Sequence, residues 1–297
     1  MPLSLPSFAK VNLHLRVLGK REDGYHDIFT VFQTVSLHDT LIFEESEDKV
    51  TLECEAPDVP TDSSNLIVRA AEGLRSEFGI SRGADIRLEK RIPMGGGLGG
   101  GSSNAAAALI GLARVWGIGA KKAGIKRIAE ELGSDVPFFL EGGTALGIGR
   151  GTELETMPDF RAAWMLIVKP EVHVSTAEAY EGLHAQSLTN ADSNRILRVC
   201  RSEAGSSDFL HSAAVNDFES SVTAAHPEIG RVKRKLIKLG ANRAMLSGSG
   251  ASVFAIFDKE ETRQTALKAL DDEVNWRKFA VAAVSRDEYR AKMFGEL

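Results

Sequence analysis

The feature that most constrains this sequence is a glycine-rich segment, Pro93–Asn104, which holds six glycines in twelve residues. Alternating residues at Ile86–Lys90 predict a strand before it, and the alanine-rich stretch from Ser103 predicts a helix to about Trp116. Backbone amides at a helix start bind anions, and glycines let the chain approach a phosphate closely. The segment is therefore expected to be a phosphate-binding loop.

Three other interpretations of the glycine-rich segment fit less well. A P-loop ends in Gly-Lys-Ser/Thr, and this segment has no lysine. A Rossmann fingerprint expects an acidic residue about 20 positions further on, at the end of the next strand. Glu130 and Glu131 lie beyond that distance, on an expected helix. A flexible linker seldom joins a strand directly to an alanine-rich helix.

Composition narrows the class of protein. With 43% hydrophobic and 26% charged residues, the chain is typical of a soluble globular enzyme. The net charge is −5 and no block of five basic residues occurs, so no nucleic-acid partner is expected; Lys233–Lys238 is predicted to be a solvated helix face. Cys54 and Cys200 form no metal pattern and fit a reducing compartment. No signal peptide and no membrane-spanning run is recognised, so a cytoplasmic protein without a membrane partner is expected.

Strands and helices alternate along the chain, with hairpins among them, which indicates an α+β fold. Strands are expected at 8–18, 28–37, 41–44, 50–56, 86–90, 164–170 and 279–285, within 135–151 after a turn, and on both sides of a glycine turn within 243–257. Helices are expected at 65–78, 103–116, 121–132, 192–204, 226–239 and 260–271. The length suits two domains, placed at 1–158 and 159–297.

Several motifs together resemble the GHMP kinases, the family of galactokinase, homoserine kinase, mevalonate kinase and phosphomevalonate kinase. Its second motif matches PMGGGLGGGSSNAAAAL from Pro93, and its C-terminal glycine motif matches LSGSGASVFAIF at 246–257. The block at 8–41, which contains AKVNL, DGYH and HDTL, narrows the resemblance to the branch that phosphorylates 4-(cytidine 5'-diphospho)-2-C-methyl-D-erythritol. SNLIVRA at 64–70 and GSDVPFF at 133–139 also match, so the resemblance covers nearly the whole chain.

This resemblance implies a fold and a reaction. The fold would have an N-terminal domain like domain 2 of ribosomal protein S5 and a ferredoxin-like C-terminal domain, with the site in the cleft between them. The reaction would move the γ-phosphoryl group of ATP to the 2-hydroxyl of the cytidyl substrate, in the methylerythritol phosphate route to isopentenyl diphosphate. Mg²⁺ is expected because the phosphate charge must be neutralised. No protein ligand of the metal is assigned, although Ser103 is a candidate. A monomer or a homodimer would suit such an enzyme.

By the same resemblance, the loop would hold the ATP phosphates through Pro93, Met94, Gly95, Gly96, Gly97, Leu98, Gly99, Gly100, Gly101, Ser102 and Ser103. Asn65 and Leu66 would contact the adenine, and Asn65 is equally expected to cap a helix. Ser247–Gly250 supplies either a second set of amides near the cleft or a turn that joins two strands.

The resemblance assigns the chemistry to Asp135 and Lys10. Asp135, in GSDVPFF, would accept the proton of the substrate hydroxyl as a positioned base. Lys10, in AKVNL, would stabilise the charged carboxylate and the negative charge that develops on the substrate oxygen. From the residues alone, Asp135 is equally a turn aspartate and Lys10 an outward-facing strand lysine.

Six residues would bind the cytidyl substrate by resemblance: Asn12, Tyr25, His26, Phe32, Thr176 and Tyr180. Asn12 shares a strand face with Lys10 because side chains repeat every two residues. A neutral His26 offers one donor and one acceptor to the cytosine edge, beside Tyr25. Many family members carry phenylalanine in place of Tyr180. Without the resemblance, these positions would be a hairpin tip, a core strand residue and ordinary helix packing.

Three competing functions remain open at this stage. Another GHMP kinase has no reason to carry the DGYH block at 23–26. A nucleotide sensor without catalysis needs the loop but neither Lys10 nor Asp135. An RNA-binding module with an S5-like fold is disfavoured by the acidic charge of the chain.

Overall fold

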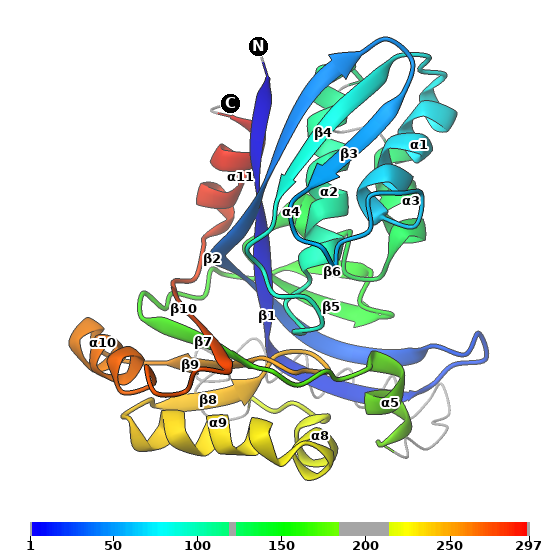
Figure 1. Cartoon of the computed structure of the whole chain (residues 1–297). Coiled ribbons are helices and arrows are strands. Elements are labelled where there is room, and N and C mark those ends of the chain that lie inside the picture. The colour runs from blue at the N-terminus through cyan, green and yellow to red at the C-terminus, as the bar shows by residue number, and fades with distance from the viewer. Residues whose placement is uncertain (1, 119–122, 184–213, 296–297) are drawn as a thin grey trace.

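Two β-sheets organise the part of the chain that the computed structural model describes, residues 2–118, 123–183 and 214–295 (Figure 1). The first sheet contains β1 (Leu3–Lys20), β2 (His26–Ser46), β3 (Val50–Cys54), β4 (Gly83–Glu89), β5 (Thr144–Gly149) and β6 (Glu153–Thr156). Its order is β3-β4-β2-β5-β6, and β1 pairs with β2. The second sheet contains β7 (Met165–Pro170), β8 (Arg243–Leu246), β9 (Val253–Ile256) and β10 (Trp276–Val281), in the order β10-β7-β9-β8.

Helices cover one side of each sheet in Figure 1. We call the first sheet with the helices on it the first lobe, and the second sheet with its helices the second lobe. The helices before β5 are α1 (Leu66–Phe78), α2 (Gly100–Val115), α3 (Ala123–Leu132) and α4 (Phe138–Glu141). Those after β7 are α5 (Thr176–Glu181), α8 (Glu219–Ala225), α9 (Pro227–Lys238), α10 (Glu260–Lys268) and α11 (Arg286–Phe294). None of the helices in the described ranges combines the length and the apolar character that crossing a bilayer requires.

The β1–β2 hairpin connects the two lobes, because its strands run from the first lobe down to the second (Figure 1). β2 pairs with β5 through Ile28–Gln33 and with β4 through Thr40–Ser46, while β1 lies along both halves. The separate strands expected at 28–37 and 41–44 are therefore one strand, and that prediction was wrong. The residues between the two expected strands, His38–Thr40, pair with β1 like their neighbours.

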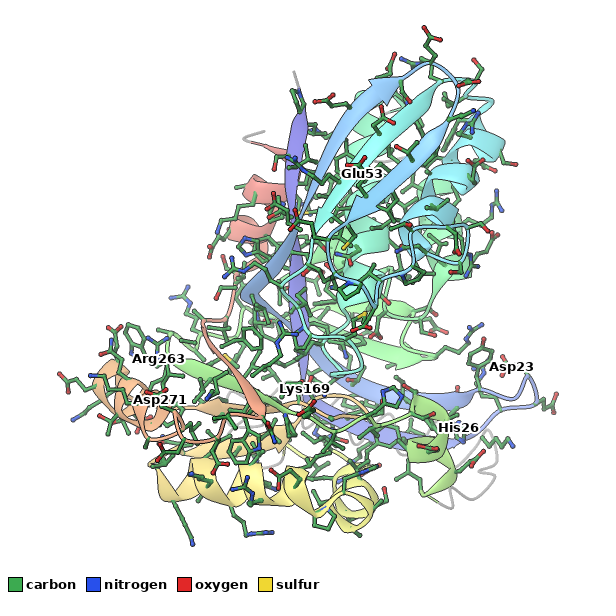
Figure 2. The ribbon with its side chains drawn as sticks, viewed as in Figure 1. Asp23, His26, Glu53, Lys169, Arg263 and Asp271 are labelled. Atoms are coloured by element: carbon green, nitrogen blue, oxygen red, sulfur yellow. The ribbon has the colours of Figure 1, made fainter. Side chains whose placement is uncertain are left out.

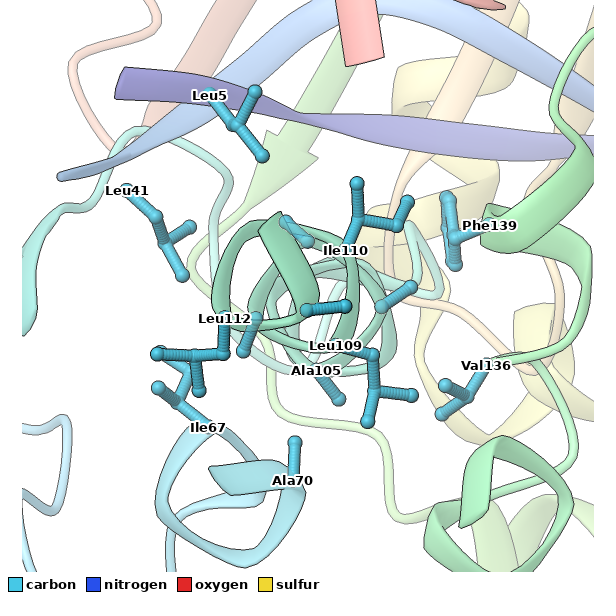
Figure 3. Close-up of a cluster of buried hydrophobic side chains, with 14 of the residues drawn as sticks. Leu5, Leu41, Ile67, Ala70, Ala105, Leu109, Ile110, Leu112, Val136 and Phe139 are labelled. Carbon is cyan, nitrogen blue, oxygen red and sulfur yellow. The ribbon is translucent and has the colours of Figure 1, made fainter. Parts of the chain in front are cut away.

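Helix α2 lies at the centre of the first core, as Figure 3 shows for Ala105, Leu109, Ile110 and Leu112. Its four consecutive alanines, 105–108, are fully buried, and their small side chains allow α1 and the sheet to approach closely. The helix begins at Gly100 and not at Ser103 as expected, so the second half of the glycine-rich segment is already helical. Gly99 precedes it with a left-handed φ of 69°, which glycine adopts without strain.

The last helix returns from the second sheet to the first lobe. Tyr289 of α11 is buried in the first core and donates its hydroxyl to the carbonyl of Phe139. Sequence periodicity missed α8, α11 and the short α4, and the helix expected at 192–204 lies outside the described residues. The division at residues 158 and 159 stays a prediction: it falls between the two sheets, while α11 crosses back over it.

Candidate active site

The glycine-rich segment is held from behind by the second lobe. Ala251, Ser252 and Ser247 donate hydrogen bonds of 3.2, 3.1 and 2.9 Å to the carbonyls of Gly95, Gly96 and Gly97, respectively. The next carbonyl, that of Leu98, accepts from the amide of Lys10 at 3.0 Å. Four successive carbonyl oxygens of the segment thus accept hydrogen bonds from other parts of the protein. The loop has a fixed shape before any phosphate reaches it.

Gly97 shows why this contact demands glycine. Its φ is +71°, and a Cβ built on it would lie 2.0 Å from the carbonyl oxygen of Ser247. A left-handed backbone and such a close approach both exclude a side chain. The C-terminal glycine motif therefore supports the glycine-rich segment.

Lys10 and Asp135 meet next to this loop, although they lie far apart in the sequence. Lys10 Nζ lies 3.4 Å from Asp135 Oδ2, and Lys10 is only 4% exposed whereas Asp135 is 32% exposed. Asp135 lies in a turn, in which the amide of Val136 donates to the carbonyl of Gly133, so its turn role and its contact with Lys10 coexist. The carboxylate can reach a solute, while the ammonium lies beneath it.

A chain of hydrogen bonds fixes the Lys10 side chain. Lys10 Nζ donates to Asn12 Oδ1 at 2.6 Å, and Asn12 Nδ2 donates to Thr30 Oγ1 at 2.7 Å. Thr30 in turn donates to the carbonyl of His14 at 2.8 Å. Lys10 and Asn12 lie on one strand face, as the alternation predicts. The pairing of β1 with β2 supplies Thr30 as the next member of the chain.

A pocket of about 260 Å³ opens over this pair. Its lining includes residues that were named from the sequence as substrate or catalytic residues: Lys10, Asn12, Phe32, Asp135, Thr176 and Tyr180. Gly97 and Gly99 bring the glycine loop to the same pocket, and Gly248 and Ser249 bring the C-terminal glycine motif. Sequence reasoning missed Leu15, Ile28 and Phe218, which look like ordinary core residues and carry no signal of their own.

Aromatic side chains form one wall of the pocket and continue past its rim. His26 stacks on Tyr180 with ring centroids 4.5 Å apart, and Phe218 meets Tyr180 edge-on at 4.8 Å. In Figure 2, His26 lies where the β1–β2 hairpin passes α5, with Asp23 further out on the same hairpin. Tyr25 does not line the pocket: it is 50% exposed and lies under the guanidinium of Arg150, 3.6 Å from its ring centre.

Burial sets the protonation of two of these rings. Burial, aided by the positive charge of Lys20, lowers the pKa of His26, so its imidazole is neutral near pH 7. Burial, with the negative charge of Asp135 adding to it, raises the pKa of Tyr180 to about 12. The Tyr180 hydroxyl therefore keeps its proton and can act as a donor.

The expected adenine and metal residues have defined places. Asn65 caps α1, because its Oδ1 accepts from the amide of Ile67 at 2.9 Å while its side-chain amide donates to the carbonyl of Pro60. Leu66 lies beside the first turn of α2 at Gly101. Ser103 is 2% exposed and its hydroxyl accepts from Ser7, so it faces a buried network rather than the pocket. Within residues 2–118, 123–183 and 214–295, no three His, Cys, Asp or Glu side chains converge on a metal position.

Comparison with known proteins agrees with this arrangement. Residues 65–143 match the family model of the GHMP kinases N terminal domain, and residues 200–275 match the GHMP kinases C terminal model. A 4-diphosphocytidyl-2-C-methyl-D-erythritol kinase from Solibacter usitatus is 42% identical over 97% of this chain and 90% of its own length. One from Pelotomaculum thermopropionicum is 42% identical over 88% of this chain and 91% of its own.

The chain belongs to the 4-diphosphocytidyl-2-C-methyl-D-erythritol kinase family. A crystal structure of 4-(cytidine 5'-diphospho)-2C-methyl-D-erythritol kinase superposes with a TM-score of 0.77 at 30% identity, over 95% of this chain and 99% of the other. A homoserine kinase from Cytophaga hutchinsonii shares the fold, with a TM-score of 0.69 at 20% identity over 95% of each chain. Family and fold confirm the predicted α+β GHMP architecture, and membership makes the chain an ATP-dependent kinase.

Proposed function

We propose that this chain transfers the γ-phosphoryl group of ATP to the 2-hydroxyl of 4-(cytidine 5'-diphospho)-2-C-methyl-D-erythritol, giving ADP and the 2-phosphate. The observation that carries the proposal is the Lys10–Asp135 pair, 3.4 Å apart. It lies in a pocket that glycine-loop residues line on one side and aromatic residues on the other. Family membership, with relatives at 42% identity, supports the choice of substrate.

Asp135 and Lys10 divide the chemistry between them. Asp135 accepts the proton of the 2-hydroxyl while that oxygen forms a bond to the γ-phosphorus and the bond to the β–γ bridging oxygen breaks. Lys10 stabilises the negative charge that grows on the attacking oxygen. Because Asn12 and Thr30 hold Lys10 in place, little reorganisation is needed at the moment of transfer.

The glycine loop serves the nucleotide. Its carbonyls accept hydrogen bonds from Ser247, Ala251 and Ser252. Because these bonds already order the loop, ATP binding does not carry the entropy cost of ordering it. The amides at the start of α2 and the helix dipole favour the phosphates. We assign the adenine contact to Asn65 and Leu66 by the family resemblance. Mg²⁺ bound together with ATP would neutralise part of the phosphate charge.

The aromatic wall serves the cytidine. His26 and Tyr180 stack on each other, and a base that extends this stack gains about 1–3 kcal/mol. A neutral His26 adds one donor and one acceptor for the base edge. Thr176, hydrogen-bonded to Ser249 at 3.2 Å, lies at the boundary between this wall and the C-terminal glycine motif.

We also propose that the enzyme is cytoplasmic, that it acts as a monomer or homodimer, and that its two domains meet near residue 158.

The test is ADP release in the presence of Mg²⁺ and ATP, with cytidyl methylerythritol, homoserine or mevalonate as the acceptor. We expect turnover with the cytidyl substrate alone, and loss of it in Asp135→Asn, which keeps the shape and removes the base. Asp271→Asn is the matched control, since Asp271 lies on the far side of the second lobe in Figure 2. Turnover of another acceptor instead, or full activity in Asp135→Asn, would contradict the proposal.

A further inference from the structure

A buried carboxylate that the chemistry does not use lies behind the glycine loop. Asp39, on β2, is fully buried and has four hydrogen-bond donors around it. Its Oδ1 accepts from the amides of Arg91 and Ile92, each at 2.7 Å. Its Oδ2 accepts from Asn104 Nδ2 at 2.9 Å and forms an ion pair with Lys90.

These four donors all come from the two ends of the glycine loop. Lys90, Arg91 and Ile92 are the residues between the end of β4 and Pro93, where the loop starts. Asn104 lies in the first turns of α2, where the loop has become helix. A single carboxylate therefore ties the entry of the loop to its exit, and neither Asp39 nor Asn104 lines the pocket.

The contacts continue beneath the start of α2. Asn104 also donates to Ser7 Oγ at 2.8 Å, and Ser7 donates to Ser103 Oγ at 2.8 Å. The Lys90 ammonium lies 3.0 Å from where a Cβ on Gly100 would be. The network thus contacts the first residues of α2, whose backbone amides would bind a phosphate.

A carboxylate without exposure is costly to bury unless donors surround it. An apolar residue opposite Ser7 would have filled this ladder position without that cost. We infer that Asp39 is a positioning residue for ATP: it fixes the separation between the end of β4 and the start of α2, and so the spacing of the loop amides. The inference rests on the proposed function for the identity of the anion.

Asp39→Asn is a sharp perturbation because every partner of Asp39 is a donor. An amide has one acceptor oxygen and one NH₂ group. Whichever way it lies, its NH₂ faces either the Arg91 and Ile92 amides or the Lys90 and Asn104 side chains. One end of the loop is released, and a misplacement of about 1 Å at such a site costs about 10²-fold.

The experiment measures the Kd for Mg²⁺-ATP by calorimetry without acceptor, and then KM for each substrate, well below the unfolding temperature. We expect Asp39→Asn to raise the Kd and KM for ATP about tenfold or more and to change the KM of the cytidyl substrate less than about twofold. Gln33→Met is the matched control. Gln33 is also buried on β2, bonds to Thr34, Val284 and Thr144, and touches neither end of the loop.

An Asp39→Asn protein that is destabilised but binds ATP with wild-type affinity would overturn the inference, and so would equal weakening of ATP binding by Gln33→Met. Should Asp39→Asn fail to fold, Asn104→Ala carries the test, because it removes the bonds from α2 to Asp39 and Ser7 and leaves the bonds of Asp39 to Lys90, Arg91 and Ile92 in place. Wild-type ATP affinity in Asn104→Ala would then reject a positioning role. The two proposals can fail separately. If the wild-type protein does not phosphorylate the cytidyl substrate but Asp39→Asn still weakens ATP binding, the proposed acceptor is refuted and the role of Asp39 stands.

Discussion

Replacement of Gly97 by alanine tests whether the C-terminal glycine motif shapes the phosphate loop. The added Cβ would lie 2.0 Å from the Ser247 carbonyl oxygen and 3.0 Å from that of Gly250. Carbon and oxygen approach no closer than about 3.3 Å in favourable contacts. The loop and the motif must therefore separate by about 1 Å, which the hydrogen bond from Ser247 to the Gly97 carbonyl, at 2.9 Å, cannot follow.

The magnitude follows from two terms. A left-handed backbone costs a residue with a Cβ about 1–2 kcal/mol, which lowers the free energy of unfolding. A displacement of about 1 Å at the phosphate loop costs about 10²-fold in kcat/KM, or about 2.7 kcal/mol of transition-state stabilisation. We expect both effects in Gly97→Ala, with the greater loss in kcat/KM for ATP.

Gly79→Ala separates the two terms. Gly79 ends α1 with a φ of +62°, close to the +71° of Gly97, but nothing lies within 4 Å of the place that its Cβ would take. The Gly79→Ala enzyme should lose about 1 kcal/mol of its free energy of unfolding and keep the wild-type kcat/KM. The assays are ADP release at varied ATP and urea unfolding of both variants. A Gly97→Ala enzyme with kcat/KM within about threefold of wild type would refute the reasoning, whatever its stability.

Three further substitutions test other parts of the structure. Lys10→Met should lower kcat about 10²–10³-fold with little change in the Kd for ATP, because it removes a donor to the developing charge; single-turnover kinetics would show it, and an effect on the ATP Kd alone would count against it. Tyr180→Phe should retain substrate affinity, whereas Tyr180→Ala should lose about 1–3 kcal/mol of it by calorimetry, and equal affinities would exclude stacking. Hydrogen bonds from Arg231 and Lys235 lower the pKa of Glu273 to about 2. Its folded-state pKa is depressed, so its stabilisation is present above about pH 4.3 and disappears as the pH falls toward 2. Glu273→Gln should therefore unfold at a lower temperature than wild type at about pH 7 but not at about pH 2, and a constant difference would contradict this.

Local patterns predicted the elements that depend on neighbouring residues. The glycine segment between a strand and a helix, the cap at Asn65 and the shared strand face of Lys10 and Asn12 all follow from short-range periodicity and backbone chemistry. The same reasoning divided β2 into strands at 28–37 and 41–44. The paired strands keep residues 38–40 in the ladder, and the buried Asp39 is satisfied by donors that come from 90–104.

The candidate site needed more than local patterns. Resemblance to a family named Lys10 and Asp135 together, but nothing in the spacing of the chain brings residues 10 and 135 within 3.4 Å. Phe218 and Leu15 gave no signal, since a core residue and a pocket residue of the same type look alike. Tyr25 and His26 were named as a pair, yet His26 stacks on Tyr180 while Tyr25 packs under Arg150.

The sequence by itself determined which residue types were available and where the chain could turn: a glycine-rich loop, a helix that starts behind it, and strands with one buried face. Tertiary structure decided which surfaces meet. Only the packing of the second lobe places Ser247 against Gly97, and only strand register places Asp39 between the two ends of the loop. The physical reason is range. Backbone propensity acts over a few residues, whereas the contacts that position phosphate and hydroxyl join segments far apart in the sequence, and these form only when apolar burial has closed the cores.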